Sequence, residues 1–160
     1  MSRILVVDDE AIMRDAVSEA LRRAGHQVDA FDGGRAALDR LAIETYHLLI
    51  TDLKMPGMDG LAVLEEAKRI SPELPAILIT AHGTIESAVE AMKKGAFDYV
   101  IKPFKLDELE ILVDRALAMR GMAIENEYLR TRVKDLDHYY IEARYPNGLP
   151  DQTPSEFFER

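Results

Sequence analysis

The polar residues of this sequence best suited to chemistry stand at the ends of short apolar runs. They are Asp8 and Asp9 after the first run, Asp52 after the third, Thr80 at the end of the fourth and Lys102 after the fifth. A single acid at such a place more often caps a helix than does chemistry. Helix capping does not account for three carboxylates, a hydroxyl and an ammonium at matching places of four separate runs.

Such a set of side chains suits the transfer of a phosphoryl group. Crowded carboxylates raise one another's pKa unless a cation joins them. Because the set offers oxygen donors and the chain has no cysteine, the fitting ion is Mg²⁺. A lysine beside the ion adds positive charge for the phosphoryl oxygens. One carboxylate can then act as a nucleophile that forms an acyl phosphate, with the Thr80 hydroxyl hydrogen-bonded to a phosphoryl oxygen.

The rest of the chain alternates between two patterns that position these residues. Apolar runs rich in β-branched residues predict strands, and apolar residues three or four positions apart predict helices. The predicted strands cover residues 4–7, 27–31, 47–51, 76–80 and 98–101, and the predicted helices residues 12–24, 34–42, 61–70 and 85–94, before a last helix that begins near Leu106. This alternation predicts an α/β fold, a doubly wound five-stranded parallel sheet with the weak strand 27–31 at an edge. Ligand sites of such sheets form past the carboxyl ends of the strands, where the polar set falls.

Length and charge narrow the class of protein. The 160 residues are 48% apolar and 31% charged, an ordinary globular mixture long enough to bury a core. A net charge of −9 is a poor match for nucleic-acid phosphates, so we expect no direct binding of nucleic acid by this chain. The first apolar run lacks the longer apolar core and the cleavage site of a signal peptide, and no run approaches the ~20 apolar residues of a membrane span, so we expect neither a signal peptide nor a membrane span. We therefore expect a cytoplasmic location and no membrane partner.

Four motifs in order resemble those of a response-regulator receiver domain of the CheY-like family. They are Val-Val-Asp-Asp-Glu (6–10), Thr-Asp-Leu-Lys-Met-Pro-Gly-Met-Asp-Gly (51–60), Ile-Thr-Ala-His (79–82) and Gly-Ala-Phe-Asp-Tyr-Val-Ile-Lys-Pro-Phe (95–104). Within that family the sequence is most similar to NtrC-type sigma-54-dependent regulators, whose receivers normally precede an AAA+ ATPase and a DNA-binding domain. The resemblance implies a flavodoxin-like sheet with strand order 2-1-3-4-5 and an extended C-terminal helix.

The resemblance also implies roles for the acids. Asp52 would be the phosphoacceptor, phosphorylated by a sensor histidine kinase. Asp9 and Asp52 would bind Mg²⁺ directly, Asp8 would contact the ion through water, and Lys54 would contribute its backbone carbonyl.

The remaining roles concern the phosphoryl group and the switch. Lys102 would bind the phosphoryl group, and the Lys102–Pro103 bond is expected to be cis. Thr80 and Tyr99 would form the switch pair, in which Thr80 moves toward the phosphate and the Tyr99 ring turns inward. The result would be a change of conformation or dimerisation that controls an output partner in transcription regulation.

The helical pattern continues well beyond Leu106. A heptad series places Met119, Asn126, Val133 and Tyr140 at position a, and Met122, Leu129 and Leu136 at position d. Valine and a single asparagine at a, with leucine at d, favour a parallel two-stranded coiled coil and hence a homodimer. Gly121 weakens this pattern, since glycine inside a helix costs ~1 kcal/mol. A long helix packed on its own domain is the alternative.

The end of the chain changes character. We divide the sequence into a receiver domain (1–120), a helical linker or coiled coil (121–138) and a tail rich in proline and tyrosine (139–160). The tail segments 139–141 and 143–150 weakly resemble part of a HEPN-type helical domain. One arginine and one histidine at loose spacing, Arg132 and His138, do not predict a nuclease, so we expect a docking segment, an interface lid or a flexible end.

Two other functions remain open at this point. A phosphatase that forms an aspartyl phosphate would carry a second acid two residues after its nucleophile, where this chain has Lys54. We therefore expect a signalling domain that catalyses only its own phosphoryl transfer and dephosphorylation. The other alternative is a dimerisation or docking scaffold that uses the receiver fold without phosphorylation.

Overall fold

The structure is a computed structural model that describes residues 2–81 and 83–120. Its centre is a parallel sheet of five strands in the order β2-β1-β3-β4-β5. The strands are β1 (Arg3–Val7), β2 (Gln27–Phe31), β3 (Leu48–Asp52), β4 (Ala76–Thr80) and β5 (Asp98–Ile101). The predicted fold class and strand order are confirmed.

Helices connect the strands as the apolar periodicity predicts. They are α1 (Ala11–Arg23), α2 (Gly34–Leu41), α3 (Gly60–Ile70) and α4 (Ile85–Lys93), and a further helix covers residues 106–120. Gly25 and Gly95 follow the ends of α1 and α4 with φ of 99° and 101°, a left-handed conformation that glycine adopts without strain.

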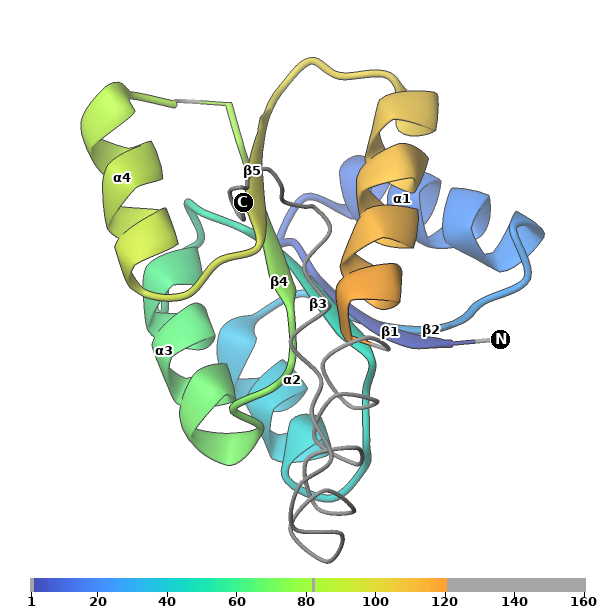
Figure 1. Ribbon diagram of the computed structural model, residues 1–160, viewed down its shortest axis with the longest axis horizontal. Helices are drawn as coiled ribbons and strands as arrows, with labels where there is room; N and C mark the ends of the chain where they lie inside the picture. Colours follow the sequence, from blue (N-terminus) through green and yellow to red (C-terminus); the bar gives the residue numbers. More distant parts are fainter. Residues whose placement is uncertain (1, 82, 121–160) are drawn as a thin grey trace, which may run out of the picture. The chain divides into compact units, whose positions relative to one another are not determined.

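The helices cover both faces of the sheet. One buried cluster packs α2, α3 and α4 on side chains such as Leu5, Leu49 and Leu78. The other packs α1 and the helix over residues 106–120 on side chains such as Ile50 and Ile77. Figure 1 shows these two layers, with α3 and α4 on one side of the sheet and α1 beside the last helix on the other. Burial on both faces explains why the central strands are continuously apolar.

The register of the sheet brings the predicted site residues to one edge. Val7 at the end of β1 pairs with Thr51 of β3, and Thr80 at the end of β4 pairs with Ile101 of β5. Asp52 pairs with Ile79, which makes it the last residue of β3, whereas the sequence pattern placed it just after the strand. The prediction of a shared edge therefore holds, with the third strand displaced by one residue.

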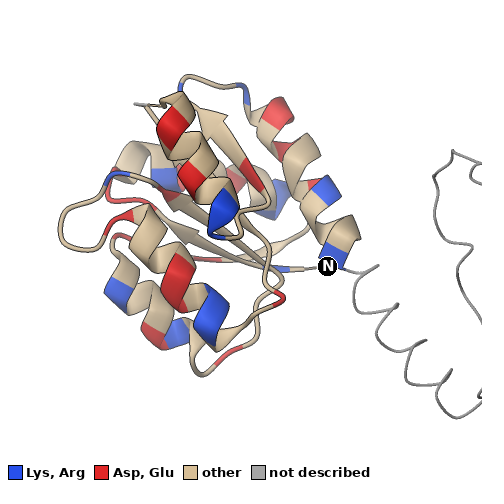
Figure 2. Ribbon diagram, turned by 60° about the vertical axis from the view of Figure 1, so that its left-hand side comes forward, with Lys and Arg blue, Asp and Glu red and all other residues tan. Residues whose placement is uncertain are grey.

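Charge is mixed over the outer surface of the described residues. Figure 2 shows lysine and arginine positions interspersed with aspartate and glutamate positions over the helices. Among the helices of residues 2–81 and 83–120, none combines the length and the apolar character needed to span a bilayer. The predicted coiled coil, apart from Met119, and the predicted tail lie outside the described residues.

Candidate functional site

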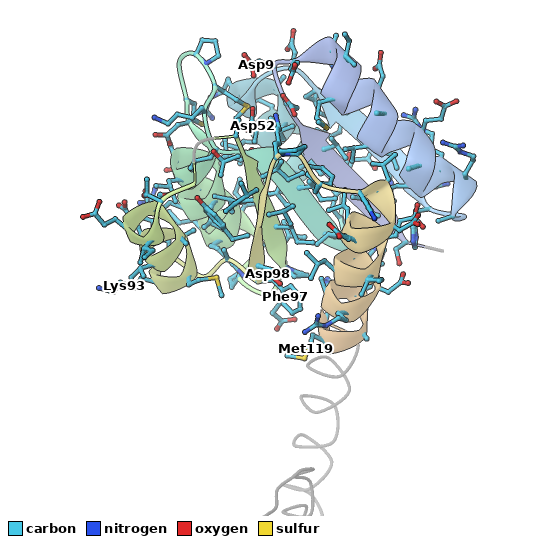
Figure 3. The ribbon with its side chains drawn as sticks, turned by 90° about the horizontal axis from the view of Figure 1, so that it is seen from above. Asp9, Asp52, Lys93, Phe97, Asp98 and Met119 are labelled. Carbon is cyan, nitrogen blue, oxygen red and sulfur yellow. The ribbon has the colours of Figure 1, made fainter. Side chains whose placement is uncertain are left out.

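Three carboxylates meet at the carboxyl edge of the sheet. Asp8 and Asp9 follow β1 and Asp52 ends β3, and one oxygen of each lies within 4.8 Å of the others. Asp8 and Asp52 are buried and Asp9 is exposed. Figure 3 shows Asp9 and Asp52 at the same edge, with Asp98 at the far edge where β5 begins. The structure brings together the acids that the sequence singled out.

Hydrogen bonds hold Asp8 in place. Its backbone N–H donates to the carbonyl of Phe31 at 3.1 Å, and the Glu10 N–H donates to its Oδ1 at 2.9 Å. Arg14 of α1 donates from Nη1 to the Asp8 carbonyl at 2.9 Å. The N-cap residue of α1 is Glu10, whose own side chain makes no capping bond. The bond from the Glu10 N–H to Asp8 resembles helix capping, but helix capping does not explain why the Asp8 carboxylate lies close to Asp52.

Lys102 supplies the positive charge at this edge. Its Nζ lies 3.7 Å from an oxygen of Asp8, 3.7 Å from an oxygen of Asp52 and 3.5 Å from an oxygen of Glu10. Burial alone would lower the pKa of Lys102, but the three carboxylates together raise it above its ordinary value. The ammonium therefore stays charged and faces the carboxyl groups. The Lys102–Pro103 bond is cis, as predicted.

Among the acids of the described residues, Asp52 has the most strongly shifted pKa. Burial, followed by the charge of Asp8, raises the pKa of Asp52 from 3.8 to about 6, although Lys102 and the Leu53 N–H act in the opposite direction. One lysine thus offsets only part of the negative charge gathered around this carboxyl group. A further cation at the edge would favour its ionised form.

The donor set fits Mg²⁺. The ligand oxygens of an octahedral Mg²⁺ lie ~3–4 Å apart, close to the spacing of the Asp8, Asp9 and Asp52 oxygens within 4.8 Å. Two buried carboxylates give such an ion its charge partners, and exposed Asp9 leaves one side open to water. A site that keeps open positions is what a metal needs when it also binds phosphate.

Close packing fixes the backbone of Asp52. The Leu53 N–H donates to the Ile79 carbonyl at 2.8 Å, and the Gly60 N–H donates to the Leu53 carbonyl at 2.8 Å. A Cβ on Gly60 would lie 2.3 Å from the Asp52 carbonyl oxygen and 2.8 Å from Leu53 Cα. Gly60 therefore has to be a glycine, because α3 begins directly against the residue that carries the candidate nucleophile.

The two predicted switch residues lie on adjacent strands. Thr80 is fully buried at the end of β4, and its carbonyl accepts the Lys102 N–H at 2.8 Å. Tyr99 of β5 is partly buried against the core, and its hydroxyl lies 2.8 Å from Ser87 Oγ of α4. Lys54, two positions after Asp52, has an exposed side chain, and the predicted role of its carbonyl stays a prediction.

The comparisons with known proteins agree with this geometry. Residues 4–114 match the model of the response regulator receiver domain. The chain belongs to the response regulator receiver family. As a receiver, it is 45% identical over 150 residues to the DNA-binding transcriptional regulator NtrC of Klebsiella pneumoniae, which covers 94% of this chain and 28% of the relative.

Two solved structures show the same receiver fold. NtrX from Brucella abortus matches with a TM-score of 0.78 and 40% identity, over 82% of this chain and 30% of that one. The beryllofluoride-activated NtrC4 receiver domain dimer matches with a TM-score of 0.72 and 32% identity, over 75% of this chain and 99% of that one. The receiver therefore corresponds to a whole receiver domain but to about a quarter of the length of the NtrC relative.

These findings bear on the rest of the sequence predictions. Since 150 of the 160 residues align with NtrC, that similarity continues past residue 120, whereas the HEPN-like segment lies outside the described residues and outside the family match. The relative is named as DNA-binding, and the chain spans 28% of it, so the expectation of no contact with nucleic acid stays a prediction.

Several residues of the receiver site went unnoticed in the sequence. Glu10, Arg14 and Ser87 contact Lys102, Asp8 and Tyr99 through side-chain positions that the sequence pattern does not report. Gly60 was quoted only as the last residue of the 51–60 motif, although it is packed against Asp52. Its place directly before an apolar helical stretch and eight positions after Asp52 was the available signal.

Proposed function

We propose that Asp52 accepts a phosphoryl group from the phosphohistidine of a sensor kinase. A carboxylate oxygen of Asp52 forms the new bond to phosphorus while the bond from phosphorus to the imidazole nitrogen breaks, and that nitrogen keeps the electron pair. Lys102 offsets the negative charge of the phosphoryl oxygens from the edge of the site. The observation that carries the proposal is the Lys102 ammonium 3.7 Å from both Asp8 and Asp52, two buried carboxylates at one sheet edge.

Mg²⁺ is the cofactor in this proposal. Asp9 and Asp52 would bind it directly, Asp8 would contact it through water, and the Lys54 carbonyl would complete the protein ligands. When bound, the ion neutralises charge on the acceptor and on the incoming phosphoryl oxygens. The carboxylate spacing within 4.8 Å and the raised pKa of Asp52 support this assignment.

The output of the switch is proposed from the relatives. The NtrC relative is named as a transcriptional regulator, and one similar structure is a beryllofluoride-activated receiver dimer. We infer that phosphorylation shifts Thr80 and Tyr99 and changes the contacts of this chain with a second copy or with an output partner. The receiver would end near residue 120, with a helical linker over 121–138 and a tail over 139–160 as separate segments.

Labelling from acetyl phosphate tests the acceptor. With Mg²⁺ present, the chain should gain the mass of one phosphoryl group, and Asp52→Asn should gain none. Asp39→Asn is the matched control, because Asp39 is an exposed acid of α2 whose contact is an ion pair with Arg35 at 4.0 Å. Labelling that survives Asp52→Asn would overturn the assignment.

A scaffold that works without phosphorylation is the alternative, and light scattering separates the two. A phosphorylation-controlled chain should change its mass or its partner affinity when beryllofluoride and Mg²⁺ are added. A scaffold should show the same mass and affinity with and without them.

A further inference from the structure

The hydroxyl of Tyr99 joins β5 to the beginning of α4. Its Oη lies 2.8 Å from Ser87 Oγ, in the first turn of the helix. The ring is partly buried, and it packs against the cluster of core residues beneath α2, α3 and α4. The tyrosine thus has an apolar face on the core and its polar end on one serine, an arrangement that fixes the direction of the ring.

Ser87 also belongs to the cap of α4. The Ser87 N–H donates to Thr84 Oγ1 at 3.0 Å, and the Thr84 N–H donates to Ser87 Oγ at 3.1 Å, which together form a capping box. The Ser87 hydroxyl can donate its single proton to the Thr84 carbonyl at 3.1 Å. When the Ser87 proton is used in this way, Tyr99 donates to Ser87; with either direction of that bond, one chain of hydrogen bonds runs from β5 into the helix cap.

The loop before α4 leaves room for this contact and little more. A Cβ on Gly83 would lie 2.9 Å from two side-chain carbons of Ile101 and 3.1 Å from the Tyr99 hydroxyl oxygen. A side chain at this position would push on both β5 residues. Because Gly83 has no side chain, the backbone passes close to the Tyr99 hydroxyl, and that hydroxyl keeps its contact with Ser87.

We infer that Ser87 is a positioning residue that holds the Tyr99 ring in its present orientation and couples the ring to the cap of α4. The inference rests on the proposed function, because it names what the switch tyrosine must release when it turns inward. Turning the ring breaks the bond to Ser87 and takes one hydrogen-bond partner from a residue of the capping box, whose bonds with Thr84 remain. The start of α4 then loosens together with the ring.

The size of the effect follows from one hydrogen bond. A single net hydrogen bond changes a two-state population by roughly two- to tenfold. Loss of the bond should raise the affinity for beryllofluoride by about that factor, since the ring would already be released. It should also raise amide exchange in the first turn of α4 by a comparable factor.

Three variants of the full chain separate the contacts. Tyr99→Phe removes the hydroxyl and leaves the bonds between Ser87 and Thr84 in place, whereas Ser87→Ala removes both sets. Thr84→Ala is the matched control, because it weakens the cap and leaves the Ser87 contact with Tyr99 available. Amide exchange of α4 is measured by NMR without ligand, and beryllofluoride affinity is measured with Mg²⁺.

We expect Tyr99→Phe and Ser87→Ala to raise both quantities. The double variant should match Ser87→Ala within about twofold, because Ser87→Ala already removes the contact with Tyr99. Thr84→Ala keeps the bond that orients the ring, so it should raise exchange and raise beryllofluoride affinity less than Ser87→Ala does. Two results would overturn the role of Ser87. One is that the effects of Tyr99→Phe and Ser87→Ala on beryllofluoride affinity multiply in the double variant. The other is that amide exchange of α4 is unchanged in both single variants. Absence of beryllofluoride binding in the parent chain counts against the proposed function. Amide exchange of α4 in the unliganded chain still tests the contact between Ser87 and Tyr99.

Discussion

Two charged regions of this receiver differ in how their acids are balanced. Near the amino ends of β1 and β3, Asp29 contacts Arg3 at 3.5 Å, Arg40 at 3.7 Å and the Tyr46 hydroxyl, and Glu44 pairs with Arg3. Two carboxylates there face two guanidinium groups. We call this set the balanced network.

The carboxyl edge is built in the opposite way. Asp8, Asp52 and Glu10 share one nearby lysine, Lys102, and Asp9 lies beside Asp8 and Asp52, with carboxylate oxygens within 4.8 Å of one another. Within the described residues, the balanced network satisfies its own charges, whereas this edge keeps an excess of negative charge. We propose that this difference distinguishes acids that stabilise the fold from acids that bind a cation and a phosphoryl group.

The largest effect on stability is expected at Gly60, which packs against the edge rather than the balanced network. Its Cβ would lie 2.3 Å from the Asp52 carbonyl oxygen, and overpacking against backbone costs about 3 kcal/mol or more. Gly60→Ala should therefore lower the free energy of unfolding in urea by about that amount. Gly33→Ala is the control, because a Cβ at Gly33 would meet nothing within 4 Å, and its effect should stay below about 1 kcal/mol.

The next effect is a pH dependence carried by Asp52. Its pKa is raised from 3.8 to about 6 by burial and then by Asp8, so the folded chain binds more protons than the unfolded chain between those values. Stability from this group is present below pH 4 and is lost as the pH rises toward 6, by on the order of 2–3 kcal/mol. Without Mg²⁺, Asp52→Asn should remove this loss and be the more stable chain at pH 7. The free energy of unfolding of both chains is measured by urea titration at several pH values between 4 and 7. If it changes with pH in the same way in both chains, Asp52 is not held in an excess of negative charge.

The balanced network should respond with the opposite sign. Asp29→Asn removes the charged partner of two arginines and a charged acceptor of the buried Tyr46 hydroxyl. We expect a loss of about 1–2 kcal/mol in the free energy of unfolding at pH 7. Asp39→Asn, at an exposed acid of α2, should change it by less than about 0.5 kcal/mol. A gain in stability from Asp29→Asn would remove the distinction between the two regions.

The tyrosine of the balanced network offers a smaller, spectroscopic check. Burial, followed by the hydrogen bond to Asp29, raises the pKa of Tyr46 to about 12. In Asp29→Asn the phenol should ionise at lower pH, because the nearby negative charge is gone. Ultraviolet titration against a Tyr46→Phe reference isolates this group among the six tyrosines of the chain.

Strand periodicity made the site edge of the sheet predictable from the sequence. Asp8, Asp52, Thr80 and Lys102 were placed at one edge because parallel strands present their carboxyl ends together. The apolar runs are short and sharply bounded, and glycines follow the ends of α1 and α4, so the elements were predictable to within one or two residues. The strand order itself came from the family resemblance.

Contacts that depend on side-chain conformers were beyond the sequence. Nothing in the spacing of Glu10 and Lys102, or of Ser87 and Tyr99, reports that their polar atoms meet at 3.5 Å and 2.8 Å. The balanced network was missed for the same reason, since Asp29 and Tyr46 are joined by tertiary packing across two elements. The close approach of Gly60 to Asp52 likewise requires the angle at which α3 leaves β3.

Binding of Mg²⁺ tests the central claim most directly. Calorimetric titration of the full chain with MgCl₂ at pH 7 should give one saturable site that is lost in Asp9→Asn and retained in Asp39→Asn. Asp9 is the test position because it is the exposed member of the cluster, so its substitution leaves the packed core intact. Equal Mg²⁺ binding by Asp9→Asn and Asp39→Asn, or no Mg²⁺ binding by the parent chain, would contradict the claim that the carboxylates at this edge of the sheet form a cation site.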